Sequence, residues 1–216
     1  MNYKILTHHY ENCLEKHGDS HLGVDWPNAL DASVRYNVMM QLVRHREQDF
    51  SILDFGCGAG HFLEHLRSSQ WANCRYVGTD LSERFIDLCK KKFPEEEFFQ
   101  IDAMKDNFHA EYDYIIANGV FTEKRDLSFD EMFDFFSILI AKLFSACRRG
   151  IAFNVMSAQV EWQRDDLFHL PLDRLASFLV GNLARHFVIR NDYGLYEYTV
   201  YLYKNPSYAT SYAKRQ

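Results

Sequence analysis

The central part of the chain alternates between short apolar runs and longer amphipathic runs with helical spacing. The apolar runs have the length and composition of β-strands and cover residues 52–55, 75–79, 97–101, 112–117 and 150–155. The amphipathic runs between them predict helices over residues 60–67, 83–92 and 129–146. Strands that alternate with helices predict a parallel sheet covered by helices on both faces.

The end of the chain departs from this alternation. A further helix fits residues 172–185, and two β-rich runs follow it within residues 186–204. Only a turn-like stretch containing Asn191, Asp192 and Gly194 separates these two runs. Because parallel neighbours need a dozen or more connecting residues, the last strand, roughly residues 197–204, is expected to run antiparallel.

Residues 1–48 precede the alternation and are expected to form a helical cap. Apolar residues at mixed three and four spacing predict helices over residues 2–17 and 31–45, with Asp31 as a possible N-cap of the second. The loop between these helices and an insertion at about residues 156–170 are the candidate lids. A chain of 216 residues with 47% hydrophobic residues can bury one sizeable core, so a single domain, residues 1–216, is expected with its core at 49–205.

A glycine-rich turn joins the first apolar run to the following helix. Gly56, Gly58 and Gly60 occupy alternate positions there, where a residue without Cβ permits positive φ and lets a ligand approach the main chain. Ligands of open α/β sheets bind beyond the carboxyl ends of the strands, which is where this turn lies. The nicotinamide fingerprint G-x-G-x-x-G fits poorly, because the third glycine comes one residue early and position 61 is His.

Polar residues also close the next three strands. Asp80 ends the second strand, where a carboxylate can accept hydrogen bonds from ribose hydroxyls. Asp102 closes the third strand, and Asn118 and Gly119 close the fourth. Each could be a surface turn residue, but polar or glycine residues at successive strand ends favour one shared ligand site.

These segments carry a family resemblance. In order and spacing, ILDFGCGAG, VGTDLS, FFQIDAMKD, YDYIIANGVF and RRGIAFNVMS resemble the motifs of class I S-adenosylmethionine-dependent methyltransferases over about residues 50–204. The resemblance implies an α/β fold with a Rossmann-like, seven-stranded, mostly parallel sheet and an antiparallel last strand. It also implies S-adenosyl-L-methionine as cofactor and S-adenosyl-L-homocysteine as product.

Carried over by position, the resemblance implies a set of cofactor-binding residues. The methionine part would lie near the glycine loop, Asp80 would hold the ribose, Asp102 would meet the adenine amino group, and Asn118 would lie near the sulfonium. Arg35, on the helix before the loop, could pair with the cofactor carboxylate or lie on a solvated helix face. The full set comprises Arg35, Asp54, Gly56, Cys57, Gly58, Asp80, Leu81, Asp102, Ala103, Met104, Asn118 and Gly119.

Methyl transfer from a sulfonium needs alignment and exclusion of water more than an elaborate catalytic set. A hydroxyl nucleophile also benefits from a base, and His169 in the insertion is the first candidate, followed by Glu123 and Tyr10. A bystander role for His169 remains open. The i, i+4 spacing of His61 and His65 lacks a third ligand nearby in the sequence, so no metal site is expected.

Composition narrows the compartment and the partners. The net charge of −6 disfavours nucleic acid, whose binding depends on clustered Lys and Arg. Five scattered cysteines without a CxxC pair favour reduced thiols and a cytoplasmic protein. No secretory signal is visible, and the most apolar segment, residues 132–144, contains Asp134 and Lys142 and is too short to span a bilayer.

Together, these features predict a cytoplasmic enzyme that methylates an oxygen or nitrogen of a small molecule. The segment ANGVF departs from the Asn/Asp-Pro-Pro-aromatic motif of enzymes that methylate nucleobase amines, which disfavours that branch. The alternatives are a non-catalytic cofactor-binding subunit, an RNA or protein methyltransferase and, further away, an NAD-dependent oxidoreductase. The acceptor and the oligomeric state are not encoded in these motifs.

Overall fold

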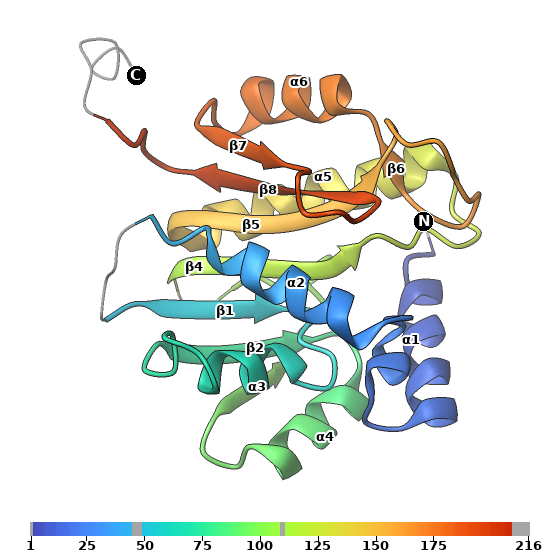
Figure 1. The fold of residues 1–216 in the computed structure, drawn as a ribbon, viewed down its shortest axis with the longest axis vertical. Coiled ribbons are helices and arrows are strands. Elements are labelled where there is room, and N and C mark those ends of the chain that lie inside the picture. The colour runs from blue at the N-terminus through green and yellow to red at the C-terminus, as the bar shows by residue number, and fades with distance from the viewer. Residues whose placement is uncertain (1, 45–48, 109–110, 209–216) are drawn as a thin grey trace.

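The computed structural model describes residues 2–44, 49–108 and 111–208. Its strands form one sheet whose main path follows the order β3-β2-β1-β4-β5-β8-β7, with β6 paired to β5 outside this path (Figure 1). The strands are β1 (Ser51–Phe55), β2 (Arg75–Asp80), β3 (Glu97–Gln100), β4 (Tyr112–Phe121), β5 (Cys147–Ser157), β6 (His169–Leu170), β7 (Phe187–Arg190) and β8 (Glu197–Tyr203).

The pairings confirm the expected fold class. Neighbours from β3 through β5 pair in parallel, whereas β8 runs antiparallel to both β5 and β7. The short turn before β8 enforces this direction, as its length requires. The two-residue β6, which pairs in parallel with β5, was not expected, because two residues carry no readable pattern.

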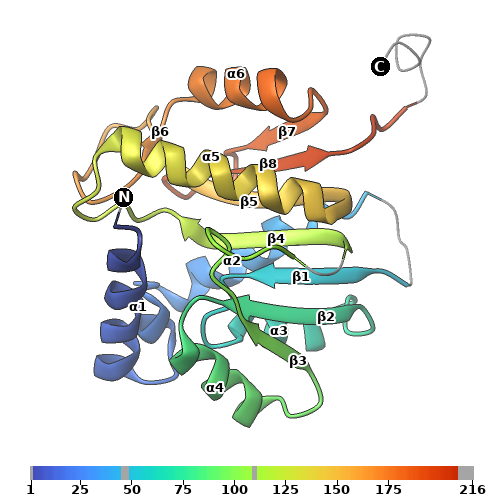
Figure 2. The same cartoon turned by 180° about the vertical axis from the view of Figure 1, so that it is seen from behind.

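Helices cover both faces of the sheet. Figure 1 shows α2 and α3 in front of the sheet, and Figure 2 shows α5 across the opposite face. The helical elements are α1 (Lys4–His17), η1 (His21–Val24), α2 (Ala29–Met40), α3 (His61–Arg67), α4 (Glu83–Lys92), α5 (Phe129–Ala146) and α6 (Leu172–Asn182). Among the described residues, no helix combines the length and the apolar character needed to cross a membrane.

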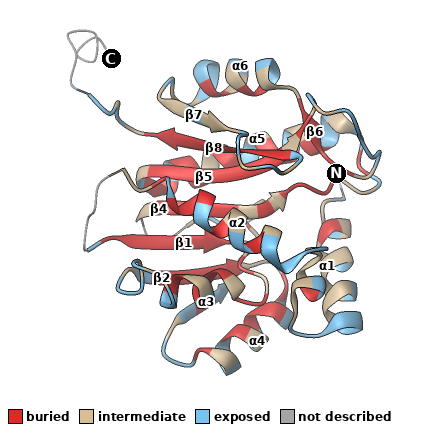
Figure 3. Cartoon of the chain, viewed as in Figure 1, coloured by how far each residue is buried: buried red, intermediate tan, exposed pale blue. Residues whose placement is uncertain are grey.

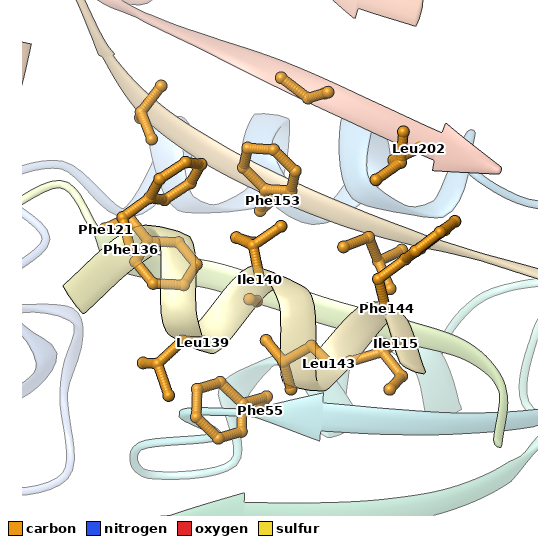
Figure 4. Packing of buried hydrophobic residues seen from close by; sticks show 14 of the residues in the cluster. Phe55, Ile115, Phe121, Phe136, Leu139, Ile140, Leu143, Phe144, Phe153 and Leu202 are labelled. Carbon is orange, nitrogen blue, oxygen red and sulfur yellow. The ribbon is translucent and has the colours of Figure 1, made fainter. Parts of the chain in front are cut away.

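Helix α5 organises the larger of two hydrophobic clusters. Its N-terminus is fixed by a capping box in which Ser128 and Glu131 bond each other's backbone N–H groups. Its buried face packs against β1, β4, β5 and β8 (Figure 4), with Phe136 edge-on to Phe121 at 5.1 Å between ring centroids. Burial of each such side chain contributes roughly 1.5–3 kcal/mol, so this helix is a main source of the stability of the sheet that carries the site.

Two sequence expectations need correction. Helix α2 begins at Ala29 and its N-cap is Asn28, whose side chain accepts from the Leu30 amide, so Asp31 lies inside the first turn. Strand β4 continues to Phe121, past the expected end at residue 117. It does so through a register irregularity that contains Gly119 with φ 79°, a conformation that glycine adopts without strain.

The N-terminal helix closes the edge of the sheet where the site was expected. In Figure 1 the arrowhead of β1 points toward α1, so α1 lies at the carboxyl ends of the parallel strands. Only Leu6 of α1 is buried, in contrast to the strands, which are mostly buried (Figure 3). Helix α1 is therefore a cover on the sheet edge and contributes little to the core. The basic residues near the end of the sequence, Lys214 and Arg215, fall outside the described residues.

Candidate active site

A cavity of about 460 Å³ lies at the carboxyl edge of the sheet, between the strand ends and the N-terminal cover. All twelve positions expected to bind cofactor line this cavity, as do Glu123 and Tyr10. We call the wall made by the glycine loop, the strand ends and Arg35 the strand-end side. The opposite wall, made by α1, the loop before α2, residues 122–125 and the insertion, is the cap side.

The glycine loop is held open by its backbone conformation. Gly56, Gly58 and Gly60 have φ values of 75°, 52° and 76°, all in the left-handed region. A Cβ at Gly56 would lie 2.6 Å from Cγ2 of Val120, and one at Gly60 would lie 2.7 Å from Cε2 of Phe93. Glycine is therefore required for both conformation and space, and the main chain borders the cavity directly.

Asp80 ties the second strand to this loop. One oxygen of its carboxylate accepts from the Gly58 amide at 3.0 Å, and the other accepts from the Ser82 amide at 2.9 Å. Burial raises the pKa of Asp80 above its usual value, although the two amides favour the ionised form. The side chain also faces the cavity, so its remaining acceptor capacity is directed at a ligand.

Asp54 lies beneath the loop at the end of β1. Its side chain accepts from the hydroxyl of Tyr76 at 2.7 Å, and only 2% of the residue is exposed. Burial raises its pKa to about 7; the Tyr76 hydrogen bond opposes this shift, whereas Asp80 adds to it. Cys57 in the same loop is buried, and a hydrogen bond with Cys89 together with burial raises its pKa, which makes it a poor nucleophile.

At the third strand end, an N-terminal residue occupies the expected ligand position. The hydroxyl of Tyr3 donates to the carboxylate of Asp102 at 2.9 Å, and Lys105 approaches it at 3.2 Å. Burial alone would raise the pKa of Asp102, but the contacts with Tyr3 and Lys105 outweigh it and hold the pKa below its usual value. Sequence reasoning missed Tyr3, which lies 99 positions away from its partner.

Arg35 is paired and does not lie on a solvated helix face. Its Nε donates to both carboxylate oxygens of Glu197, at 3.0 and 2.9 Å, and its guanidinium lies 4.1 Å from the ring centroid of Trp26. The exposed fractions of the Arg35 and Glu197 side chains are 11% and 1%. Asn154 links this pair to β4, because its Nδ2 donates to Glu197 and its Oδ1 accepts from the Gly119 amide.

Two buried polar atoms on the strand-end side have no hydrogen-bond partner among the described residues. They are Nη1 of Arg35 and Oδ1 of Asn118, a charged donor and a neutral acceptor. Unpaired buried polar groups cost free energy and call for an explanation. Both residues line the cavity, so a ligand that carries an anionic and a cationic group would satisfy them together.

On the cap side, Glu123 and Tyr10 lie close to the end of β4. The Tyr10 hydroxyl donates to the carbonyl of Gly119 at 3.2 Å, and Arg125 pairs with Glu123 at 3.2 Å. Burial raises the pKa of both Tyr10 and Glu123. Arg125 also contacts Asp166 at 3.2 Å, which ties this corner to the insertion.

His169 does not lie where a general base would be needed. It is buried in β6 and is not among the residues that line the cavity. Its Nδ1–H donates to the Ser157 carbonyl at 2.7 Å, and its Nε2 accepts from the Arg164 amide at 3.2 Å. Both ring nitrogens are thus used to hold the insertion. The general-base role expected for His169 is therefore not supported by its position.

Aromatic residues of the two candidate lids line the cavity. Trp26 and Trp162 border it, whereas Phe121 and Phe168 belong to the hydrophobic core. His61 also lines the cavity, where it pairs with Asp19 at 2.8 Å. Asp19 contacts Lys92 as well, at 2.8 Å, so this network fixes the first loop against α3 and α4.

His9, to which the sequence assigns no role, makes a close contact on the cap side of the cavity. Its Nε2 lies 2.7 Å from a carboxylate oxygen of Asp25, and both residues line the cap side. The available signal was weak: His9 lies one residue before Tyr10, and Asp25 precedes Trp26 in the candidate lid. Nothing in the sequence predicts that α1 and this loop fold against each other.

Comparison with known proteins identifies related sequences. The family model described as a methyltransferase domain matches residues 53–135. Rv1506c of Mycobacterium tuberculosis, a protein named as a methyltransferase, is 28% identical over 157 residues, which cover 72% of this chain and 93% of that protein. A malonyl-[acyl-carrier protein] O-methyltransferase of Priestia megaterium is 34% identical over 76 residues, or 34% of this chain and 27% of that protein.

Solved structures share the fold at low sequence identity. Magnesium protoporphyrin IX methyltransferase (ChlM) from Synechocystis PCC 6803, crystallised with S-adenosylhomocysteine, has a TM-score of 0.65 and 16% identity, and the match covers 94% of this chain and all (100%) of that chain. The plantazolicin methyltransferase BpumL, crystallised with a pentazolic desmethylPZN analog and S-adenosylhomocysteine, has a TM-score of 0.61 and 17% identity, and the match covers 94% of this chain and 90% of that chain. The Rossmann-like fold class expected from the sequence is therefore confirmed.

Proposed function

Because this chain is a class I S-adenosylmethionine-dependent methyltransferase, we propose that it transfers a methyl group to an oxygen or nitrogen of a small-molecule acceptor. The cofactor, when bound, supplies a methyl group that is already activated on a sulfonium. The protein then has to bind, align and shield the reacting groups. The residues of the cavity fit these tasks.

The observation that carries this proposal is the pair of unpartnered atoms on the strand-end side. The methionine part of the cofactor has a carboxylate, which would pair with Nη1 of Arg35, and an ammonium group, which would donate to Oδ1 of Asn118. Glu197 holds Arg35 in place through Nε, so a residue that lines the cavity keeps Nη1 without a hydrogen-bond partner among the described residues.

The nucleoside part fits the neighbouring strand ends. Asp80 would accept from the ribose hydroxyls, and Leu81, Ala103 and Met104 offer apolar surface for the adenine. Asp102 is shared with Tyr3 of the cap, so the adenine amino group would complete a site that the cap helps to form. The cap thereby couples cofactor binding to closure of the cavity.

We place the acceptor on the cap side, near Gly119, Tyr10 and Glu123. Tyr10 covers the carbonyl of Gly119, and Trp162 and Arg164 of the insertion border the same wall. A cavity of about 460 Å³ lies within the size range of small-molecule sites and would be shared by both substrates. With a net charge of −6, an RNA acceptor is disfavoured.

The names of the similar proteins support the proposal of a small-molecule acceptor. These proteins include enzymes named for malonyl-[acyl-carrier protein], for magnesium protoporphyrin IX and for plantazolicin. We propose a single domain, residues 1–216, in which residues 1–48 cap a core at 49–205 and residues 156–170 act as a lid. The polar contacts of the cap with the strand ends support this organisation.

Isothermal titration with S-adenosylhomocysteine tests the proposal. We expect saturable binding that Asp80→Ala weakens at least ~10-fold, because hydrogen bonds to charged groups contribute about 1.5–3 kcal/mol each. Asp87→Ala, an exposed carboxylate on α4, is the matched control and should bind like the wild type. Absence of binding at millimolar ligand would contradict the proposal, and a product assay with metabolite acceptors would separate an enzyme from a non-catalytic subunit.

A further inference from the structure

We propose that His9 and Asp25 form the proton-accepting pair of this enzyme and that its acceptor is a hydroxyl compound. This inference rests on the proposed function and deepens it. It draws on a histidine–carboxylate contact of 2.7 Å between α1 and the loop before α2, at the cap side of the cavity. Among the residues expected to serve as base, none offers a comparable unoccupied ring nitrogen.

The backbone conformation around Asp25 holds its carboxylate against the ring of His9. Asp25 has φ 59°, an uncommon conformation for a residue with a side chain, and it caps the short helix η1. The Trp26 amide bonds to the His21 carbonyl at 2.7 Å, and Nδ1–H of His21 donates back to the Trp26 carbonyl at 2.6 Å. This double closure fixes the loop and places Asp25 opposite His9.

The contact decides which nitrogen of His9 is free. An ionised Asp25 accepts from Nε2–H of His9, which leaves Nδ1 unprotonated in the neutral ring. Nδ1 has no hydrogen-bond partner among the described residues, and His9 lines the cavity. Asp25 is thus a positioning residue that sets the tautomer, and His9 is the group that would touch the acceptor.

The other candidate bases are occupied. Glu123 is paired with Arg125, and the Tyr10 hydroxyl donates to Gly119. His61 has a similar carboxylate contact, but it lies in the helix that follows the glycine loop, and its partner Asp19 is shared with Lys92. Only His9 stands beside Tyr10, with 5.2 Å between the two ring centroids, at the wall assigned to the acceptor.

In the proposed step the acceptor oxygen exchanges its proton for the methyl group. The acceptor O–H bond breaks and its proton moves to Nδ1 of His9 while the oxygen bonds to the methyl carbon. The carbon–sulfur bond breaks, and its electron pair remains on the sulfur of S-adenosylhomocysteine. His9 then carries one positive charge, which Asp25 stabilises, and it loses the proton to water after the methyl ether leaves.

Charged and titratable groups from several elements face His9. Cys13 lies one turn further along α1, with its Sγ 4.0 Å from Nε2, and Tyr10 adjoins on the same helix. Glu123, which follows β4, acts on His9 and Asp25 through space, Arg125 acts on Cys13 and Glu123, and Asp25 itself comes from the loop. Burial raises the pKa of Cys13, Tyr10 and Glu123, so at neutral pH the thiol and the phenol stay uncharged.

The same three side chains, His9, Cys13 and Asp25, bring ligand atoms within 4.8 Å of one another, so a metal ion is the competing interpretation. The 2.7 Å contact between His9 and Asp25 is a hydrogen bond, and it favours proton transfer over coordination. The two interpretations differ in what Nε2 does: it carries a proton in a proton-accepting pair, and it loses that proton when it binds a metal.

Nitrogen-15 NMR of histidine-labelled full-length protein, saturated with S-adenosylhomocysteine, tests the pair without an acceptor. We expect His9 to be the Nε2–H tautomer when neutral, and Asp25→Asn to reduce that preference. Asp19→Asn, which alters the His61 contact instead, is the control and should leave the His9 signals unchanged. An Nδ1–H tautomer, or retention of one equivalent of Zn²⁺ on Nε2 after dialysis, would overturn the proposal.

The kinetic arm uses S-adenosylmethionine with phenols and primary amines as probe acceptors. His9→Gln should lower kcat for a hydroxyl acceptor by roughly 10²–10⁴-fold and remove the acidic limb of its pH profile. Its affinity for S-adenosylhomocysteine should stay within twofold of the wild type, which separates this inference from cofactor binding. His8→Gln, exposed on the same helix, is the matched control. Methylation of an amine with kcat unaffected by His9→Gln would refute the assignment.

Discussion

The two sides of the cavity are built from different kinds of chain segment. The strand-end side consists of residues that directly follow strands of one sheet, and its charged groups are buried: the side chain of Glu197 is only 1% exposed. The cap side is assembled from α1, a loop and an insertion. Its contacts with the rest of the fold include exposed pairs such as Arg84 with Glu15, whose side chains are 59% and 70% exposed. The first side can hold a common cofactor, whereas the second can vary with the acceptor.

The largest effect is expected from Arg35→Met on the strand-end side. This change leaves the buried carboxylate of Glu197 without its cation, and removal of one partner of a buried pair costs about 3–5 kcal/mol. Urea denaturation at neutral pH should show this loss of unfolding free energy. The double variant Arg35→Met/Glu197→Gln should recover part of it, and a loss below ~1 kcal/mol in the single variant would contradict the buried pair.

The next effect is the pH dependence caused by Asp54. Its pKa is raised to about 7 in the fold, so between about pH 4 and pH 7 the folded protein binds a proton that the unfolded chain has released. The contribution of Asp54 to the free energy of unfolding therefore falls as pH rises through this window. Asp54→Asn should flatten the profile and be more stable than the wild type at pH 8. Parallel profiles for the two proteins would show that Asp54 is not buried in this way.

A smaller effect is expected where the two sides meet. Tyr3→Phe removes the hydroxyl that donates to Asp102, and a hydrogen bond to a charged group contributes about 1.5 kcal/mol or more. Because the pKa of Asp102 is lowered in the fold, the difference from the wild type should be present at neutral pH and shrink as pH falls through the pKa of Asp102. Denaturation curves at pH 7 and pH 3 would measure this, and an equal difference at both values would contradict the contact.

The smallest effect is expected on the exposed part of the cap. Arg84 contacts Glu15 of α1 at 3.2 Å, but both side chains are largely solvent-exposed. Exposed ion pairs contribute about 0–1 kcal/mol and are screened by salt. Arg84→Ala should therefore change the unfolding free energy by less than ~1 kcal/mol, with no difference in 1 M NaCl. A larger loss would mean that the cap is tied to the core as firmly as the strand ends are.

The sequence predicted the strand-end side well because its signals are local. A polar residue directly follows each of these strands in the sequence. Because the strands are parallel, Asp80, Asp102 and Asn118 come to one edge of the sheet, and no contact between distant segments has to be predicted. The role of the loop glycines could also be predicted, since their backbone conformation depends only on the local turn between strand and helix. The extension of β4 to Phe121 was missed because the irregularity at Gly119 interrupts the strand pattern.

The cap side was predicted less well because its contacts join distant segments. Tyr3 reaches Asp102, and His9 reaches Asp25, through the packing of α1, which has a single buried residue to signal its orientation. The sequence predicts His169 as a general base because histidines in loops near the carboxyl ends of strands often act as bases. Its two backbone hydrogen bonds, which assign it to the insertion instead, cannot be inferred from its neighbours in the sequence.

A crystal structure of the complex with S-adenosylhomocysteine tests the central claim most directly. The account predicts the ribose hydroxyls on the carboxylate of Asp80, the amino-acid carboxylate on Nη1 of Arg35 and the amino group on Oδ1 of Asn118. A nucleoside bound elsewhere, or an Arg35 guanidinium and Asn118 amide that make no contact with the ligand, would contradict it.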